Sequence, residues 1–171
     1  MRNSLALTLA VVVAFLVSGC ALRLNRALVS SVPAQRMQVR TTAYTRSEGT
    51  GCRNAIGTYL SGRHVQSAAS DWSRFPLGTR FRIVDTTEEY VIDDYGTALV
   101  GTNTIDLYKP TRLEMKQWGV RHVSIDVLQW GSREESLKVL APRSKHRIVR
   151  QMILALQKKS SSASAKRAAP D

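Results

Sequence analysis

Three aspartates, Asp71, Asp94 and Asp106, are the side chains of this sequence best suited to proton transfer. Aspartate is depleted in β-strands, yet Asp94 ends one strand-like run and Asp106 lies inside another. Side chains alternate along an extended chain, so Ile105 and Leu107 share one face and Asp106 takes the other. If the two apolar residues enter the core, Asp106 faces a groove or solvent.

Each aspartate also has a structural alternative. Asp71 could cap the turn that leads to Pro76, and Asp94 could form a turn before Gly96. Asp106 could pair with an arginine of a neighbouring strand, because structural ion pairs also involve carboxylates in strands. The residues alone leave these alternatives open.

Other catalytic chemistry is less well supported. The three histidines, His64, His122 and His146, lack the spacing of a zinc site, so we expect no metal and no cofactor. The segment around Cys52 resembles the nucleophile segment of L,D-transpeptidases, with His64 or His122 as a possible base. The remainder of that pattern, a His followed by Ser-x-Gly-Cys, is missing, so this is the weaker alternative.

The net charge of the chain lies mostly outside the segment that we expect to form the core. The 171 residues are 43% hydrophobic and carry a formal charge of +12, which suits one compact domain with basic appendages. Residues 41–139 hold twelve basic and twelve acidic side chains, so the excess lies on the flanks. A nucleic-acid reader would carry the charge on its folded face, so we expect no nucleic-acid partner. Basic flanks suit lipid headgroups or wall polymers, unless they are only solvated tails.

The N-terminus has the pattern of an export signal. Arg2 precedes the apolar run Leu5–Val17, whose thirteen residues are too few to span a bilayer comfortably. The run ends in Val-Ser-Gly-Cys20, which resembles the lipobox of bacterial lipoproteins and implies that residues 1–19 are removed and Cys20 is lipidated. The alternative is an ordinary secretory signal with Cys20 bonded to Cys52.

Residues 20–37 have no clear hydrophobic period and are predicted to be a tether. Together with lipidation, this predicts a lipoprotein of the bacterial cell envelope that faces the periplasm. Ala21, rather than Asp, after the cysteine resembles the sorting signal for the outer membrane rather than the inner.

Short strands dominate the middle of the chain. Alternating apolar residues and turn signals predict strands at Thr41–Thr45, Val65–Ala69, Arg80–Val84, Glu89–Asp94, Thr104–Tyr108 and Val120–Leu128. Thr111 and Glu114 have capping-box spacing, and Gly119 can end the short helix that they begin. Several strands and one short helix within about ninety residues favour a mainly β fold, a small barrel.

The C-terminal part, residues 131–159, is predicted to be helical. Ser132 and Glu135 have the spacing of a helix start, and Ile148 to Leu156 follow the period of a basic amphipathic helix. That helix packs on its own domain or lies on a membrane, and we favour the first. Residues 160–171, rich in Ser, Ala and Lys, are predicted to be disordered.

The settings of the aspartates also carry a family resemblance. They read Ala-Ala-Ser-Asp71-Trp-Ser-Arg-Phe-Pro-Leu-Gly-Thr, Val-Ile-Asp-Asp94-Tyr-Gly and Gly-Thr-Asn-Thr-Ile-Asp106-Leu-Tyr. Over residues 38–130 this resembles the 3D domain, named for three aspartates, which is similar to the catalytic barrel of membrane-bound lytic transglycosylase A and to RlpA-like barrels. The resemblance implies a six-stranded double-psi β-barrel that acts on peptidoglycan glycan strands, with Asp106 as the catalytic acid.

Lytic transglycosylases let the C6 hydroxyl of the sugar attack, which gives a 1,6-anhydro product, so one residue can be acid and then base. Such an acid must stay protonated near neutral pH, and a second carboxylate nearby raises its pKa. We therefore expect Asp94 and Asp71 to tune or orient Asp106.

Aromatic rings can stack on sugars. The candidates for contact with the glycan are Tyr44, Trp72, Tyr95 and Tyr108. The chain departs from the family pattern at Val100, where a lysine is usual, and it lacks the second domain that closes the groove of the membrane-bound enzyme. A barrel that only binds glycan or a wall enzyme is therefore the alternative.

Overall fold

The computed structural model describes residues 35–48, 51–86 and 88–168. The chain divides into two compact units, residues 1–33 and 34–171, and the first lies outside the described residues. The signal segment, Cys20 and the tether up to residue 34 therefore stay predictions. No helix among the described residues is long and apolar enough to cross a membrane.

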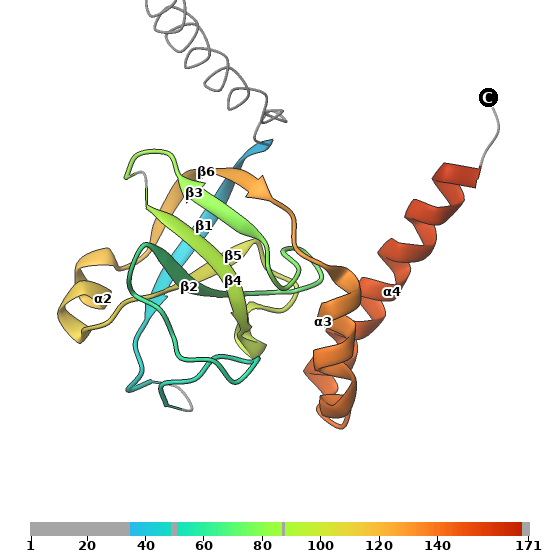
Figure 1. The fold of residues 1–171 in the computed structure, drawn as a ribbon, viewed down its shortest axis with the longest axis horizontal. Coiled ribbons are helices and arrows are strands. Elements are labelled where there is room, and N and C mark those ends of the chain that lie inside the picture. The colour runs from blue at the N-terminus through green and yellow to red at the C-terminus, as the bar shows by residue number, and fades with distance from the viewer. Residues whose placement is uncertain (1–34, 49–50, 87, 169–171) are drawn as a thin grey trace, which may run out of the picture. The chain divides into compact units, whose positions relative to one another are not determined.

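Six strands form a closed barrel, as Figure 1 shows. They are β1 (Gln35–Tyr44), β2 (Val65–Ser70), β3 (Arg80–Ile83), β4 (Glu89–Tyr95), β5 (Thr104–Tyr108) and β6 (Arg121–Gln129). The order around the barrel is β1-β5-β2-β4-β3-β6. The pairs β1–β5 and β2–β4 are parallel, and the other four pairs are antiparallel. The expected mainly β, six-stranded barrel is confirmed.

The interior of the barrel is filled by the apolar residues of each alternating strand. In β5, Ile105 and Leu107 are completely buried, while Asp106 between them is only half-buried. In β6, Val123, Ile125 and Val127 enter the same core. Burial of each large apolar side chain stabilises the fold by about 1.5–3 kcal/mol. The alternation therefore fixes the face on which Asp106 lies.

The first strand begins at Gln35, six residues before the start that we expected from the sequence. Its early part pairs with β6, from Gln35 opposite Val127 to Thr41 opposite Arg121. This part carries polar side chains on its outer face, so it lacks a strong hydrophobic signal. The last residues assigned to the tether, 35–37, therefore belong to the barrel.

Two helices begin where their caps predict. The helix α2 (Arg112–Trp118) has a complete capping box between Thr111 and Glu114, and it ends at Gly119. The helix α3 (Arg133–Leu140) begins after Ser132, whose hydroxyl accepts from the backbone N–H of Glu135. Two single turns of 3-10 helix, η1 (Thr97–Leu99) and η2 (Ala141–Arg143), complete the connections.

The last helix, α4 (Arg147–Ala168), packs on the barrel unit. Val149, Met152 and Leu156 are buried in the same core as Trp72, so the favoured prediction for this helix is confirmed. The backbone stays helical to Ala168, so the disorder predicted from residue 160 is wrong up to that point. Helix propagation costs far less than nucleation, and alanine and lysine favour helix, so a packed helix extends readily into this segment.

Candidate active site

A cavity of about 540 Å³ opens at one end of the barrel, and two of the three aspartates line it. Asp94 lies near the end of β4 and Asp106 in the middle of β5. The strand β2 runs between them, and its Ala69 is the register partner of both. Since the side chain of Ala69 is a single methyl group, the space between the two carboxyl groups stays open.

An irregularity in the pairing of β2 with β4 sets the direction of Asp94. Ala68 pairs with Ile92, but Ala69 pairs with Asp94, so Asp93 is the extra residue of the pair of strands. Bulges of this kind redirect side chains next to active sites. Asp93 is buried, with an exposed fraction of 9%, and Asp94 lines the cavity.

Asp94 holds its proton more strongly than an ordinary carboxyl group. Its pKa is raised to about 6, chiefly by burial, and the nearby charge of Asp93 contributes to the rise. Backbone hydrogen bonds from Tyr95 and Ala55 and the charge of Arg143 lower the pKa of Asp94 but do not reverse the shift. The Tyr95 N–H donates to Oδ1 of Asp94 at 2.9 Å.

Asp106 has a different set of neighbours. Burial raises its pKa, the hydrogen bond from Thr42 lowers it, and the charge of Glu48 raises it. The Thr42 hydroxyl donates to Oδ1 of Asp106 at 2.6 Å. We expected Asp94 or Asp71 to raise the pKa of Asp106, but burial and Glu48 do so instead.

Two of the four aromatic candidates line the cavity, Tyr44 and Tyr95. The buried hydroxyl of Tyr44 has no hydrogen-bond partner among the described residues. Burial raises the pKa of Tyr44, and the charges of Asp94, Asp93 and Asp106 raise it further, so the phenol stays neutral. Tyr44 is therefore a neutral donor close to the carboxyl groups, free to bond to a ligand.

The other two aromatic residues have supporting positions. Tyr108 is 7% exposed and contacts the ring of Tyr44 edge-on, with the centroids 5.6 Å apart. Trp72 is completely buried, so its predicted contact with sugar is wrong. Its indole N–H donates to the carbonyl oxygen of Asp94 at 2.7 Å, because a buried indole needs an acceptor. Trp72 thus supports the strand end that carries Asp94.

Asp71 does not line this cavity. It is 2% exposed, and its two oxygens accept from the backbone N–H groups of Ser73 and Gly101, each at 2.8 Å. This matches the structural alternative, in which the carboxylate holds a turn. The structure brings Asp94 and Asp106 to one cavity, while Asp71 is buried outside the lining of that cavity. A catalytic role for Asp71 stays a prediction.

Asp93 is a functional candidate that sequence reasoning passed over. Its Oδ2 accepts from Asn54 at 2.9 Å and from the hydroxyl of Ser67 at 2.6 Å. Burial raises the pKa of Asp93, and its Oδ1 has no partner among the described residues. The only sequence signal was the doubled aspartate at the end of a strand.

The cysteine alternative gains no support from the geometry. Cys52 is exposed and free, and His64 and His122 are also exposed. No hydrogen bond among the described residues joins Cys52 to either histidine. In the same part of the chain, no group of three or more His, Cys, Asp or Glu side chains could hold a metal ion.

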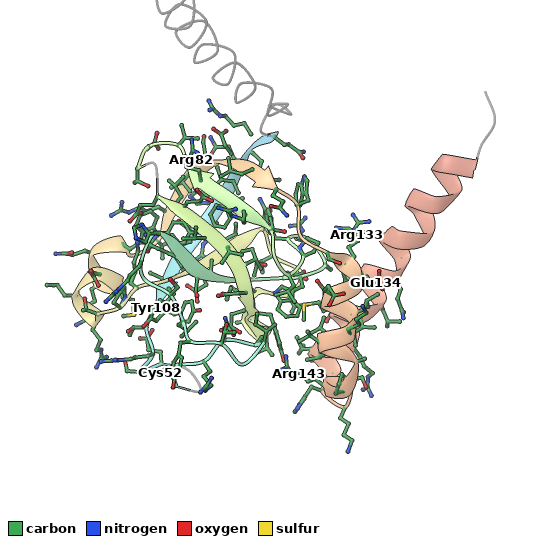
Figure 2. All side chains as sticks on the ribbon, in the orientation of Figure 1. Cys52, Arg82, Tyr108, Arg133, Glu134 and Arg143 are labelled. Atoms are coloured by element: carbon green, nitrogen blue, oxygen red, sulfur yellow. The ribbon has the colours of Figure 1, made fainter. Side chains whose placement is uncertain are left out.

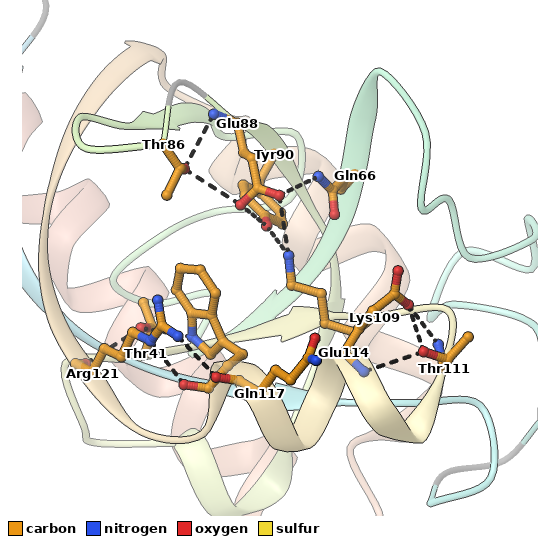
Figure 3. A network of polar contacts seen from close by, with 11 residues as sticks. Thr41, Gln66, Thr86, Glu88, Tyr90, Lys109, Thr111, Glu114, Gln117 and Arg121 are labelled. Carbon is orange, nitrogen blue, oxygen red and sulfur yellow. Dashed lines mark hydrogen bonds and ion pairs between the residues drawn. The ribbon is translucent and has the colours of Figure 1, made fainter.

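A second cavity, of about 460 Å³, lies beside α2 around Lys109, and Figure 3 shows its polar network. The Lys109 ammonium donates to the Tyr90 hydroxyl at 2.7 Å and lies 3.4 Å from Glu88. Glu88 also accepts from Tyr90 and from Gln66, at 3.0 and 3.3 Å. Since these groups satisfy one another, the network stabilises the barrel, and the first cavity is the better candidate site.

Comparison with known proteins finds one family match and a similar solved structure. Residues 66–129 match the family model of the 3D domain. Among solved structures, an apo form of a variant of the E. coli lytic transglycosylase MltA is similar, with 24% sequence identity and a TM-score of 0.36. That match covers 47% of this chain and only 28% of the other. No curated protein matches the chain.

Proposed function

Because residues 66–129 form a 3D domain, we propose that this chain acts on peptidoglycan glycan strands as a lytic transglycosylase. The observation that carries the proposal is the pair of carboxyl groups, Asp94 and Asp106, on either side of Ala69 in one cavity. Cleavage of a glycosidic bond needs a proton donor and benefits from a second carboxylate near the sugar.

The environments of the two carboxyl groups support Asp94 as the proton donor, although the sequence pointed to Asp106. A donor must hold its proton near neutral pH, and burial raises the pKa of Asp94 to about 6. The hydroxyl of Thr42 donates to Asp106, which favours the ionised form of Asp106. Asp106 would then stabilise the positive charge that develops on the sugar ring.

The proposed reaction needs no water and no cofactor. Asp94 gives its proton to the glycosidic oxygen while the bond from that oxygen to C1 breaks. The C6 hydroxyl oxygen of the same sugar bonds to C1, and its proton returns to Asp94. The products are a 1,6-anhydro sugar end and a free hydroxyl on the leaving sugar. The neutral hydroxyl of Tyr44 can donate to an oxygen of the bound sugar.

The test uses the purified chain and isolated peptidoglycan sacculi, with release of anhydromuropeptides as the measurement. We expect Asp94→Asn to lower the rate by about a hundredfold or more, because it removes the general acid. Asp106→Asn should also be impaired. The matched control is Asp85→Asn, an exposed aspartate outside the cavity, which should keep the parent rate.

Three results would contradict the proposal in different ways. An Asp94→Asn variant at the parent rate would remove Asp94 as the donor. Reducing-end products without the anhydro ring would indicate a hydrolase. Binding of the parent protein to sacculi without any turnover would favour the alternative of a glycan-binding barrel, to which the replacement of the usual lysine by Val100 already points.

A further inference from the structure

We propose that Arg143, outside the 3D domain, is a positioning residue that holds the segment around Ala55 against Asp94. The inference rests on the proposed role of Asp94 as proton donor. Arg143 lies in η2, on the segment that joins α3 to α4. In the view of Figure 2, Arg143 and Cys52 both lie near the lower edge of the molecule.

The first link runs through the backbone of Ala55. Nη2 of Arg143 donates to the carbonyl oxygen of Ala55 at 2.6 Å, and the N–H of Ala55 bonds to the Asp94 carboxyl. Asn54, the preceding residue, donates to Asp93 at 2.9 Å. The segment is thus held on both sides, by the barrel through Asn54 and by the C-terminal extension through Arg143.

The second link runs through aromatic rings. The Arg143 guanidinium lies 5.7 Å from the centroid of the Tyr95 ring, and the Tyr95 N–H donates to Asp94. Tyr95 contacts Trp72 edge-on, with the centroids 5.2 Å apart. The backbone N–H of Trp72 donates to the sulfur of Met152 in α4 at 3.3 Å. Arg143 and Met152, both after the family match, therefore contact Tyr95 at the end of β4 and Trp72 just after β2, and each of these two residues donates a hydrogen bond to Asp94.

The charge of Arg143 also acts on Asp94. A nearby cation favours a carboxylate, so Arg143 lowers the pKa of Asp94 and opposes burial and the charge of Asp93. Besides Tyr95, the other titratable groups that line the cavity with Asp94 are Tyr44, which is neutral, and Glu48, Arg53 and Asp106, all of which stay in place when Arg143 is replaced. Removal of Arg143 thus takes away both the guanidinium charge and the hold on Ala55, and each loss changes the titration of Asp94 in the same direction.

The test measures the titration of Asp94 directly, by ¹³C NMR of side-chain carboxyl groups in the full chain. In Arg143→Gln we expect Asp94 to titrate at higher pH than in the parent. Arg143→Lys keeps the cation but donates from one nitrogen, so it should show a smaller shift of the same sign. Arg150→Gln removes the same charge from an exposed position on α4 and should leave Asp94 unchanged.

Kinetics on sacculi supply the second readout. We expect Arg143→Gln to lower kcat by up to about a hundredfold with little change in KM, because misplacement of a catalytic group costs rate rather than affinity. The alkaline limb of its pH profile should move to higher pH together with Asp94. If the Arg143 contact only stabilised the fold, its loss would change the melting temperature. It would leave both the alkaline limb of the pH profile and the titration of Asp94 unchanged.

The outcomes separate this inference from the proposed function. If Asp94 titrates as in the parent in both Arg143 variants, or in Arg143→Lys when Arg143→Gln does not fold, the inference is wrong, whatever the activity. If the titration shifts but the parent protein has no activity, the positioning contact is supported and the transglycosylase proposal fails. A shift in Arg150→Gln of the same size would also overturn the inference.

Discussion

Asp94 and Asp106 lie on either side of Ala69, and their hydrogen-bond donors differ in kind. Asp94 receives only backbone donors and lies near another carboxyl group, whereas Asp106 accepts from the hydroxyl of Thr42. Burial is the largest cause of the raised pKa of both groups. In the proposed mechanism, the hydroxyl donor on Asp106 therefore distinguishes the carboxylate from the acid, because burial raises the pKa of both side chains.

The pH dependence of stability should report on Asp94. Its pKa is raised from 3.8 to about 6 on folding, so the stability that it contributes is complete below pH 3.8 and is lost as the pH rises through 6. At pH 7, Asp94→Asn should therefore be more stable than the parent, by about 1–3 kcal/mol. Urea unfolding at pH 7 and at pH 3.5 checks this, since the gain should vanish at the lower pH.

The pH dependence of the activity should also report the titration of Asp94. With Asp94 as the acid, the rate should fall about tenfold for each pH unit well above 6, since only the protonated form donates. The pH profile of anhydromuropeptide release measures this limb. A rate that is constant from pH 6 to pH 9 would exclude Asp94 as the donor.

Ala69 should be sensitive to size, because it lies between the two carboxyl groups and lines the cavity. In Ala69→Leu the added atoms fill the space that a sugar would occupy, so activity should be lost. Overpacking should cost about 1–3 kcal/mol of stability, which thermal unfolding measures. If Ala69→Leu folds and keeps the parent rate, the glycan does not pass between Asp94 and Asp106.

At the scale of elements, the junction between barrel and C-terminal extension depends on one glycine. A Cβ on Gly131 would lie 2.2 Å from the carbonyl oxygen of Leu77 and 2.4 Å from that of Pro76. Backbone atoms cannot move aside as a flexible side chain can. The backbone at Gly131 therefore packs directly against the turn at residues 76–79, and no side chain fits between them.

Gly131→Ala should thus destabilise the protein by about 1–3 kcal/mol or more. The comparison is Gly96→Ala, whose Cβ would meet only the flexible side chain of Leu99 at 3.0 Å. Thermal unfolding of both variants measures the difference. Equal melting temperatures would mean that the turn relaxes without cost.

The elements that could be predicted from the sequence are those with local signals. Alternation predicted most strands, and the caps at Thr111 and Ser132 predicted two helix starts. The early start of β1 was missed because its outer face is polar. The length of α4 was missed because the composition of residues 160–168 resembles that of a disordered tail.

The candidate site was predicted in part, because the sequence around its aspartates resembles one family pattern but its details depend on register. The pairing of Ala69 with Asp94 rather than Asp93 decides which carboxyl group faces the cavity, and no period in the sequence reveals a bulge. Arg143 comes from another element, 49 residues further along the chain than Asp94. Such long-range contacts exist only in the folded barrel.

For the whole molecule, the location of the protein stays a prediction, because Cys20 lies outside the described residues. We expect Cys20→Ser to abolish acylation and to move the protein from the membrane fraction to the soluble fraction. Mass spectrometry of the mature N-terminus and fractionation of the source cells measure the two effects. An unmodified parent protein with a disulfide between Cys20 and Cys52 would support the secretory alternative.

The position of β1 has a mechanical consequence. Its two neighbours, β5 and β6, lie along its opposite edges. A force applied along this strand would load its hydrogen bonds to β5 and β6 together, in shear, whereas a force across the strand would break them one after another. The barrel should therefore resist unfolding by a force along β1 better than by a force across it.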